Sequence, residues 1–443
     1  MSENAAATTA DAGEAPPAFV NAVAELGARR EVKTSQPIYN AQGIKLLEGG
    51  ATIDQTLYDR LVSHRLSLPL DECIDPGPGV DAASLQAAAR AAAARFPFFA
   101  RVAPDDASGK ALIDTLAAVR LPKPVALHLT LARETRPALF EHSILMALLC
   151  AHLVRESGAG KAELRAAAAA GLLHDLGMLH IEPGLLDSEE RLSGDELRPV
   201  YVHPVTSSLL VDRFPEFPKE IVRAILEHHE RLDGSGYPRA IAGEAMSPLG
   251  RVLALAEVVT AMFDGERRLP EQRVSLLLRI NPRRYDAAHV AVVHRLLAAP
   301  AAADDGADID GEALVARLLR LADVLALWRT SSEAMGAGLA GARAASLAAV
   351  DAQNATLQRM LYDAGVTREQ LASIAAEVGT DPALRVELWA LAEELLWQLH
   401  AAANQLKRRW RVEPGEVHPG ELTAWFAAVA ALDANGAGSP GPA

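Results

Sequence analysis

Segments that favour β-strands are confined to one short part of this sequence. Between residues 31 and 74, two short runs of extended character, 36–39 and 44–47, flank a loop that contains Asn40 and Gly43, which predicts a β-hairpin. Elsewhere, aromatic residues make up only 5% of the chain and the helix-forming residues alanine and leucine are abundant. The sequence therefore predicts a mainly α-helical protein and excludes an all-β architecture.

The 443-residue chain is long enough for about three domains. Gly/Pro-rich and acidic stretches at 75–79 and 300–310 indicate linkers. Within the first module, Asp54 is a candidate N-cap for a helix to about Val62. The predicted segments are a disordered leader (1–30), a small α+β module (31–78), a central helical domain (82–299), a C-terminal helical domain (309–432) and a disordered tail (433–443).

The C-terminal part differs in composition from the rest of the chain, because it contains all five tryptophans. A helix predicted over 382–410 repeats leucine at three-to-four-residue spacing, which is typical of a core face or of a seam with a partner helix. We therefore expect a helical interaction domain that forms a homo-oligomer or binds a signalling partner. The leucines are Leu384, Leu388, Leu391, Leu395 and Leu399, and the tryptophans are Trp328, Trp389, Trp397, Trp410 and Trp425.

Charge and cysteine content indicate which partners and which cellular compartment to expect for the protein. With 43 Lys and Arg against 57 Asp and Glu, the net charge is −14, which disfavours general nucleic-acid binding. The basic run 407–409 closes a helix, where cations interact favourably with the helix dipole. Two cysteines and no uncharged apolar stretch of about 18 residues predict a cytoplasmic protein that does not enter a membrane.

Five of the thirteen histidines form an ordered series at intervals of 32, 29, 25 and 1 residues, which places them on different helices of one bundle. A single histidine of this kind is usually a core residue, but His174 is followed by Asp175 inside an otherwise apolar stretch. Burying an adjacent imidazole and carboxylate without partners is costly, and a metal ion supplies the partner. A carboxylate can also bridge two cations. The five are His142, His174, His203, His228 and His229.

The run HHERLDGSGYP at 228–238 resembles the HHExxDGxGYP motif of HD-GYP domains, a subgroup of the HD phosphohydrolase superfamily, at every specified position. The resemblance covers about residues 120–290. It implies an HD-type helical bundle that binds divalent metal ions, with iron or manganese favoured and zinc an alternative. It also implies hydrolysis of the bacterial second messenger cyclic di-GMP, to the linear dinucleotide pGpG or to GMP.

The same resemblance assigns residues to roles. It implies catalytic roles for Asp175, Asp233 and Tyr237, and contact with substrate by Gly236, Pro238 and the residue at position 178. The glycines at 234 and 236 would allow a tight turn. The implied metal ligands are His142, His174, Asp175, His203, His228, His229 and Glu257.

Four positions depart from the family pattern. Met178 replaces a lysine near the substrate phosphate, which removes a cation that would stabilise developing negative charge. Glu257 and Thr260 replace two aspartates, of which the first is a ligand. Ala138 stands where trinuclear members have a glutamate, so we expect two metal ions and not three.

These losses leave a second hypothesis, in which the domain is a silent scaffold that binds metal or cyclic di-GMP and signals through its C-terminal helices. Retention of all five histidines and Asp175 favours an enzyme, because a scaffold does not require so many buried polar groups. A third interpretation, a hydrolase of another nucleotide, is disfavoured by the GYP segment.

Overall fold

The structure is a computed structural model of the chain. It describes residues 17–53, 61, 64–75, 77–186, 198–265, 268–297, 309–335, 339, 341–363, 366, 375, 378–410 and 419–432. The chain divides into two compact units. Unit 1 comprises Met1–Ser188, Arg198–His229 and Met246–Thr260, and unit 2 comprises Glu189–Leu197, Glu230–Ala245 and Ala261–Ala443. These units differ from the domains expected from sequence, whose limits stay a prediction.

Unit 1 begins with a small α+β module. Strand β2 (Ile38–Tyr39) pairs antiparallel with β3 (Lys45–Leu47), which confirms the predicted hairpin. Strand β1 (Lys33–Thr34) pairs with the more distant β4 (Ile74–Asp75), which follows the 3₁₀ helix η1 (Leu70–Glu72). The helix predicted from Asp54 lies mostly outside the described residues.

Residues 17–29, which were predicted to lie in a disordered leader, form helix α1 (Pro17–Arg29). Phe19, Val23 and Leu26 lie at four- and three-residue spacing and are buried, so this segment has an apolar face that packs into unit 1. The Phe19 ring stacks on the rings of His128 and His180, with centroids 4.6 and 5.0 Å away. The prediction of disorder over 1–30 was therefore wrong for residues 17–29, and residues 1–16 lie outside the described part.

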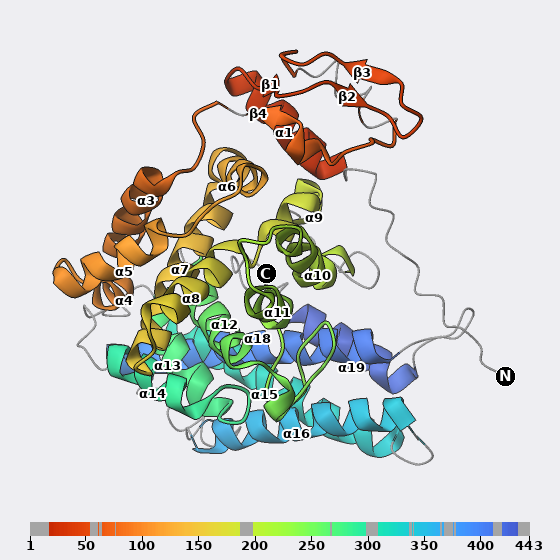
Figure 1. Ribbon diagram of the computed structural model, residues 1–443. Helices are drawn as coiled ribbons and strands as arrows, with labels where there is room; N and C mark the ends of the chain where they lie inside the picture. Colours follow the sequence, from red (N-terminus) through yellow and green to blue (C-terminus); the bar gives the residue numbers. More distant parts are fainter. Residues whose placement is uncertain are drawn as a thin grey trace. The chain divides into compact units, whose positions relative to one another are not determined.

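The rest of unit 1 is a helical bundle (Figure 1). Helix α7 (Pro137–Glu156) packs along α8 (Lys161–Leu173), and the approach is close because a Cβ on Gly171 would lie 2.9 Å from the Ala147 backbone. The other helices are α3 (Ala82–Arg95), α4 (Pro97–Val102), α5 (Ala107–Ala117), α6 (Lys123–Thr135), η2 (Leu176–His180), α9 (Pro183–Leu186), α10 (Arg198–Asp212), α11 (Lys219–Glu227) and α12 (Pro248–Thr260).

Helix α7 is long and apolar enough to cross a membrane by length and composition alone. However, 78% of its most apolar window is buried inside the fold, and it contacts α3, α6, α8 and α12. A mostly buried helix of this composition is the central helix of a bundle, and we assign α7 that role.

Unit 2 has a core of its own among long helices. Helix α15 (Gly311–Met335) packs against α16, α18 and α19, and Trp328 and Trp425 are buried side by side with ring centroids 4.5 Å apart. The leucine stripe lies in this core, and its helix ends one residue before the predicted limit. The other elements are η4 (Gly243–Ala245), η5 (Ala261–Phe263), α13 (Pro270–Ile280), α14 (Ala287–Leu297), α16 (Gly341–Asp363), α18 (Pro382–Arg409) and α19 (Gly420–Ala431).

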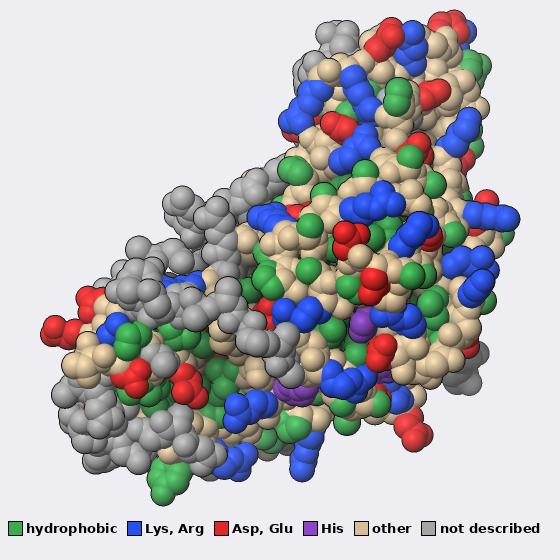
Figure 2. All heavy atoms as spheres, turned by 90° about the vertical axis from the view of Figure 1, so that its left-hand side faces the viewer, with side chains coloured by type: hydrophobic (Ala, Val, Ile, Leu, Met, Phe, Trp, Pro, Cys, Tyr) green, Lys and Arg blue, Asp and Glu red, His purple; other side chains and the backbone are tan. Residues whose placement is uncertain are grey.

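Charged side chains of both signs are mixed on one face of the molecule. Figure 2 shows Lys and Arg interleaved with Asp and Glu over the face drawn there, with small apolar groups between them.

Candidate metal centre

The predicted metal ligands of the first unit converge from five helices. Two of the histidines lie at helix ends, because α8 stops at Leu173 and α11 stops at Glu227, so the residues that follow turn into the interior of the bundle. All seven predicted ligands come together there: His142 of α7, His174 and Asp175 after α8, His203 of α10, His228 and His229 after α11, and Glu257 of α12.

Asp175 lies between the histidines. Its Oδ2 is 3.2 Å from His174 Nε2, and its Oδ1 is 3.1 Å from His203 Nε2 and 3.6 Å from His228 Nε2. The two oxygens of one carboxylate therefore face different histidines, which is the arrangement that a bridging ligand requires.

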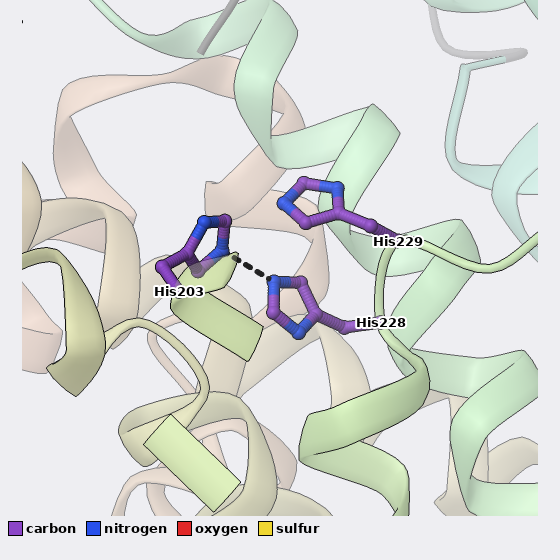
Figure 3. Close-up of side chains that lie close together, drawn as sticks. All are labelled: His203, His228 and His229. Carbon is purple, nitrogen blue, oxygen red and sulfur yellow. Dashed lines mark hydrogen bonds between the residues drawn. The ribbon is translucent and has the colours of Figure 1, made fainter. Parts of the chain in front are cut away.

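The donor atoms fall into two groups. His203, His228 and His229 form one group and His142, His174 and Asp175 the other, and the donor atoms within each group lie within 4.8 Å of one another. Figure 3 shows the first group, with the Nε2 atoms of His203 and His228 facing each other at 3.0 Å. Two imidazole nitrogens can approach this closely only if one is protonated or if a cation lies between them.

Glu257 supplies the second carboxylate. Its Oε2 lies 3.2 Å from His142 Nε2 and 3.3 Å from His174 Nε2, so the extra methylene still places the carboxylate within reach of the second group. Thr260, one turn later on α12, is fully buried, and its hydroxyl has no hydrogen-bond partner among the described residues.

Three of the histidine rings are oriented by their own helices. The Nδ1 atoms of His174, His203 and His228 each donate to the backbone carbonyl three residues earlier, at Gly171, Val200 and Ile225. A proton held on Nδ1 leaves the lone pair of Nε2 free to bind a metal, and backbone carbonyls often fix metal-binding imidazoles in this way.

Burial and mutual proximity shift the ionisation of these groups. Burial opposes ionisation of Asp175, but the imidazoles of His174 and His203 hold the pKa of its carboxyl well below the usual range. Burial likewise lowers the pKa of His174, yet the neighbouring carboxylates of Asp175 and Glu257 outweigh burial and raise it to about 9. For His228, burial dominates and lowers the pKa to about 4. A buried anion among imidazoles suits divalent cations.

The donor set fits divalent metal ions on observations independent of the motif. His174 Nε2 and Asp175 Oδ1 are buried without a well-formed hydrogen bond among the described residues, despite their short distances to other ligand atoms. Buried polar atoms are rarely left in that state unless they bind an ion or water. Imidazole and carboxylate donors suit iron, manganese or zinc.

Met178, the residue expected to lie near substrate, is part of a short 3₁₀ helix. Helix α8 ends at Leu173, and Leu176–His180 form the separate 3₁₀ helix η2, so Met178 is not one α-helical turn beyond His174. The side chain of Met178 is buried, and its backbone carbonyl accepts a hydrogen bond of 2.6 Å from Arg136. The role of Met178 stays a prediction, and α-helical periodicity counted from His174 does not give the direction of its side chain.

The other departures have plain structural settings. Ala138 is exposed near the start of α7 and has no donor atom. Glu141, beside His142 on the same helix, forms an ion pair with Arg95.

The remaining motif residues belong to unit 2, in a segment we call the motif loop (residues 230–245). Here Asp233 Oδ1 accepts from Ser235 N at 2.9 Å, and Oδ2 accepts from Arg284 Nε at 3.1 Å. Gly234 has φ +75°, in the left-handed region that favours glycine. Gly236 is buried, Tyr237 is partly buried and Pro238 is exposed.

Comparison with known proteins agrees with the geometry of the centre. The family model described as HD domain matches residues 127–288, which is less than half of the chain. The chain contains an HD domain of the HD-GYP type.

Curated relatives match part of the chain. A 3'3'-cGAMP-specific phosphodiesterase of Vibrio cholerae is 36% identical over 28% of this chain and 28% of its own length. A cyclic di-GMP phosphodiesterase of Pseudomonas aeruginosa is 32% identical over 36% of this chain and 38% of its own length. The chain therefore matches well under half the length of these relatives.

A solved structure, Bd1817, a HDG"Y"P protein from Bdellovibrio bacteriovorus, aligns with 60% of this chain and 95% of that chain at 17% identity. Its TM-score of 0.35 is too low to support a conclusion about this chain.

Two residues that stabilise the surroundings of these sites could not be identified from the sequence. Arg136 donates to the Met178 and Ile181 carbonyls, and Glu227, fully buried, accepts from Ser247 N and Oγ at 2.8 and 2.6 Å. Neither has a motif around it, and only the fold brings each close to its partner.

Proposed function

We propose that this chain is a metal-dependent phosphodiesterase that hydrolyses cyclic di-GMP in bacterial signalling. The observation that supports the proposal best is the position of Asp175, whose two oxygens face histidines of both donor groups in one buried centre. Two divalent ions held there would supply positive charge to a phosphodiester and lower the pKa of a water molecule.

The residues of the chain have distinct tasks in this proposal. His203, His228 and His229 would hold one ion, His142, His174 and Glu257 the other, and Asp175 both. The carbonyl contacts of the three Nδ1 atoms keep the rings oriented before substrate arrives, which avoids reorganisation during the reaction. Asp233 and Tyr237 would act on substrate from the motif loop, together with Gly236 and Pro238.

The substrate class comes from the relatives. One is specific for 3'3'-cGAMP and another acts on cyclic di-GMP, so both act on cyclic dinucleotides. The complete donor set supports hydrolysis over a silent scaffold, since a scaffold does not need seven convergent ligands. We place the protein in the cytoplasm, where the two buried free cysteines would stay reduced.

One assay tests the proposal directly. Protein purified anaerobically is loaded separately with iron, manganese and zinc, and each form is incubated with cyclic di-GMP or 3'3'-cGAMP. We expect one metal form to convert cyclic di-GMP to pGpG or GMP, identified by chromatography of the products. Metal analysis of the same samples should give two ions per chain. Absence of hydrolysis in every form with two ions bound would favour the scaffold.

A further inference from the structure

The motif loop is partly folded by its own residues. The buried carboxylate of Glu230 accepts hydrogen bonds from the backbone N–H groups of Arg239 at 2.7 Å and Ile241 at 3.1 Å. Leu232 O accepts from Gly243 N at 2.9 Å, which closes the base of the loop. These bonds fix the second half of the loop, and Gly234 N donates to Arg231 O at 2.8 Å within the turn. The turn around Gly234 and Tyr237 also receives contacts from other parts of unit 2.

The last turn of α18 supplies contacts to that turn. Arg409 donates from Nη2 to the carbonyl of Gly234, and the guanidinium of Arg408 lies over the Tyr237 ring, 5.0 Å from its centroid. A guanidinium on an aromatic face and a charged donor on a carbonyl are both favourable contacts, and both restrict their partner's orientation.

A buried hydrogen-bond chain reaches the same turn from a second direction. Gln398 of α18 is fully buried, and its Oε1 accepts from Gln353 of α16 at 2.9 Å and from Arg284 at 3.2 Å. Arg284 in turn donates to Asp233, and its backbone carbonyl accepts from Leu232 N at 3.0 Å. The turn is therefore connected to two long helices of unit 2.

The three consecutive cations at the end of α18 have different partners. Lys407 lies over the Phe426 ring of α19, 5.1 Å from its centroid, whereas Arg408 and Arg409 contact the motif loop. A favourable interaction with the helix dipole would apply to all three alike. The dipole therefore does not explain why Arg408 and Arg409 contact the motif loop.

We propose that Arg408 and Arg409 are positioning residues that hold the motif loop in its substrate-binding form, so that α18 is part of the binding apparatus for the cyclic dinucleotide. The link to substrate rests on the function proposed above. The link to loop order does not, because it depends only on contacts within unit 2.

Hydrogen exchange tests loop order in the full-length protein without substrate. Arg408→Ala and Arg409→Ala should each speed exchange of backbone amides at 232–238 by at least about fivefold, since the loop would open more often. Lys407→Ala removes the same charge from the neighbouring position and should leave these amides unchanged. Unchanged exchange in both arginine variants would overturn the proposal, whether or not the protein hydrolyses cyclic di-GMP.

Steady-state kinetics test the link to substrate. If the binding-competent loop is populated for only part of the time, the apparent affinity falls by that fraction. Arg409→Ala should therefore raise KM at least about fivefold with kcat and metal content within about twofold of the wild type, and Arg409→Lys should recover part of the loss by donating to the same carbonyl. Unchanged KM would overturn the substrate link. If Arg409→Ala is poorly folded by circular dichroism, Arg409→Lys with Arg408→Gln provides the same comparison.

Discussion

In the metal centre, the rings of His174, His203 and His228 are oriented by carbonyls three residues earlier in the chain, whereas the turn of the motif loop is held by Arg284 and by α18. The first arrangement is local, and any helix with histidine at these positions can form it. The second depends on residues up to 175 positions away, from Gly234 to Arg409. Metal binding should therefore survive changes in the C-terminal helices that disturb the loop.

The largest effect is expected for a substitution of Asp175 in the metal centre. Asp175→Ala removes the carboxylate that faces both donor groups, so both ions should be lost and hydrolysis should fall on the order of 10³-fold or more, the scale on which single catalytic groups act. Metal analysis and anomalous scattering give the number of ions. Asp212→Ala removes an exposed carboxylate from α10 and should retain both. Loss of only one ion in Asp175→Ala would show that Asp175 is not the bridge.

The second-largest expected effect concerns Glu394, a buried residue of α18. Burial raises the pKa of Glu394 to about 7, although its hydrogen bond from Gln398 and the charges of Arg273 and Arg284 oppose the shift. Between about pH 4.5 and 7 the folded protein keeps this proton while the unfolded chain has lost it, so stability falls as pH rises through that window. The full shift corresponds to about 3 kcal/mol above pH 7.

Glu394→Gln keeps the shape and removes the charge. The variant should be more stable than the wild type at pH 8 and nearly equal at pH 4.5, as measured by urea unfolding at both pH values. Glu387→Gln, at an exposed position of the same helix, should show no such difference. Equal stability of Glu394→Gln and wild type at pH 8 would mean that Arg273 and Arg284 keep the carboxylate ionised without cost.

The sequence predicted the metal centre better than the loop, for reasons visible in particular residues. The spacing of the histidines and the pair His174-Asp175 are properties of the chain itself, and the leucine stripe of α18 follows from helical periodicity. The end of α8 at Leu173 was not predicted, because the apolar pattern continues through Leu176 while the backbone changes to a 3₁₀ helix. The contact between Arg408 and Tyr237 depends on tertiary packing and leaves no local pattern.

Gly177 of η2 tests how tightly the metal centre is packed. A Cβ on Gly177 would lie 2.5 Å from the carbonyl oxygen of His203 and 2.9 Å from Ser207 N, so Gly177→Ala should push η2 away from α10. Overpacking of this kind costs about 1–3 kcal/mol, and metal content should fall in the group that contains His203. Gly184→Ala, where a Cβ would have no atom of the described residues within 4 Å, is the matched control and should leave stability and metal content unchanged. Equal metal content in both variants would show that η2 can move without disturbing His203.

The smallest expected effect concerns Met178, at the position where the family motif has a lysine. Met178 has no charge and no donor, so it cannot stabilise negative charge on a phosphate oxygen, and a lysine at that position can. We expect Met178→Lys to raise kcat/KM for cyclic di-GMP at least about tenfold, which corresponds to about 1.4 kcal/mol, with metal content unchanged.

The control for this last change is Met178→Leu, which keeps an apolar side chain of similar size and should have the activity of the wild type. The side chain at position 178 projects from η2 and not from a continuation of α8, because α8 ends at Leu173. Helical periodicity therefore does not predict the outcome, and the measurement is informative. If the wild type is already fast and Met178→Lys is no faster, another cation fulfils this role. Arg136 is then the first to test, because its guanidinium lies 2.6 Å from the Met178 carbonyl oxygen and because it is the N-cap residue of α7, the helix that contains His142. Arg136→Gln should in that case lower kcat while both ions remain bound.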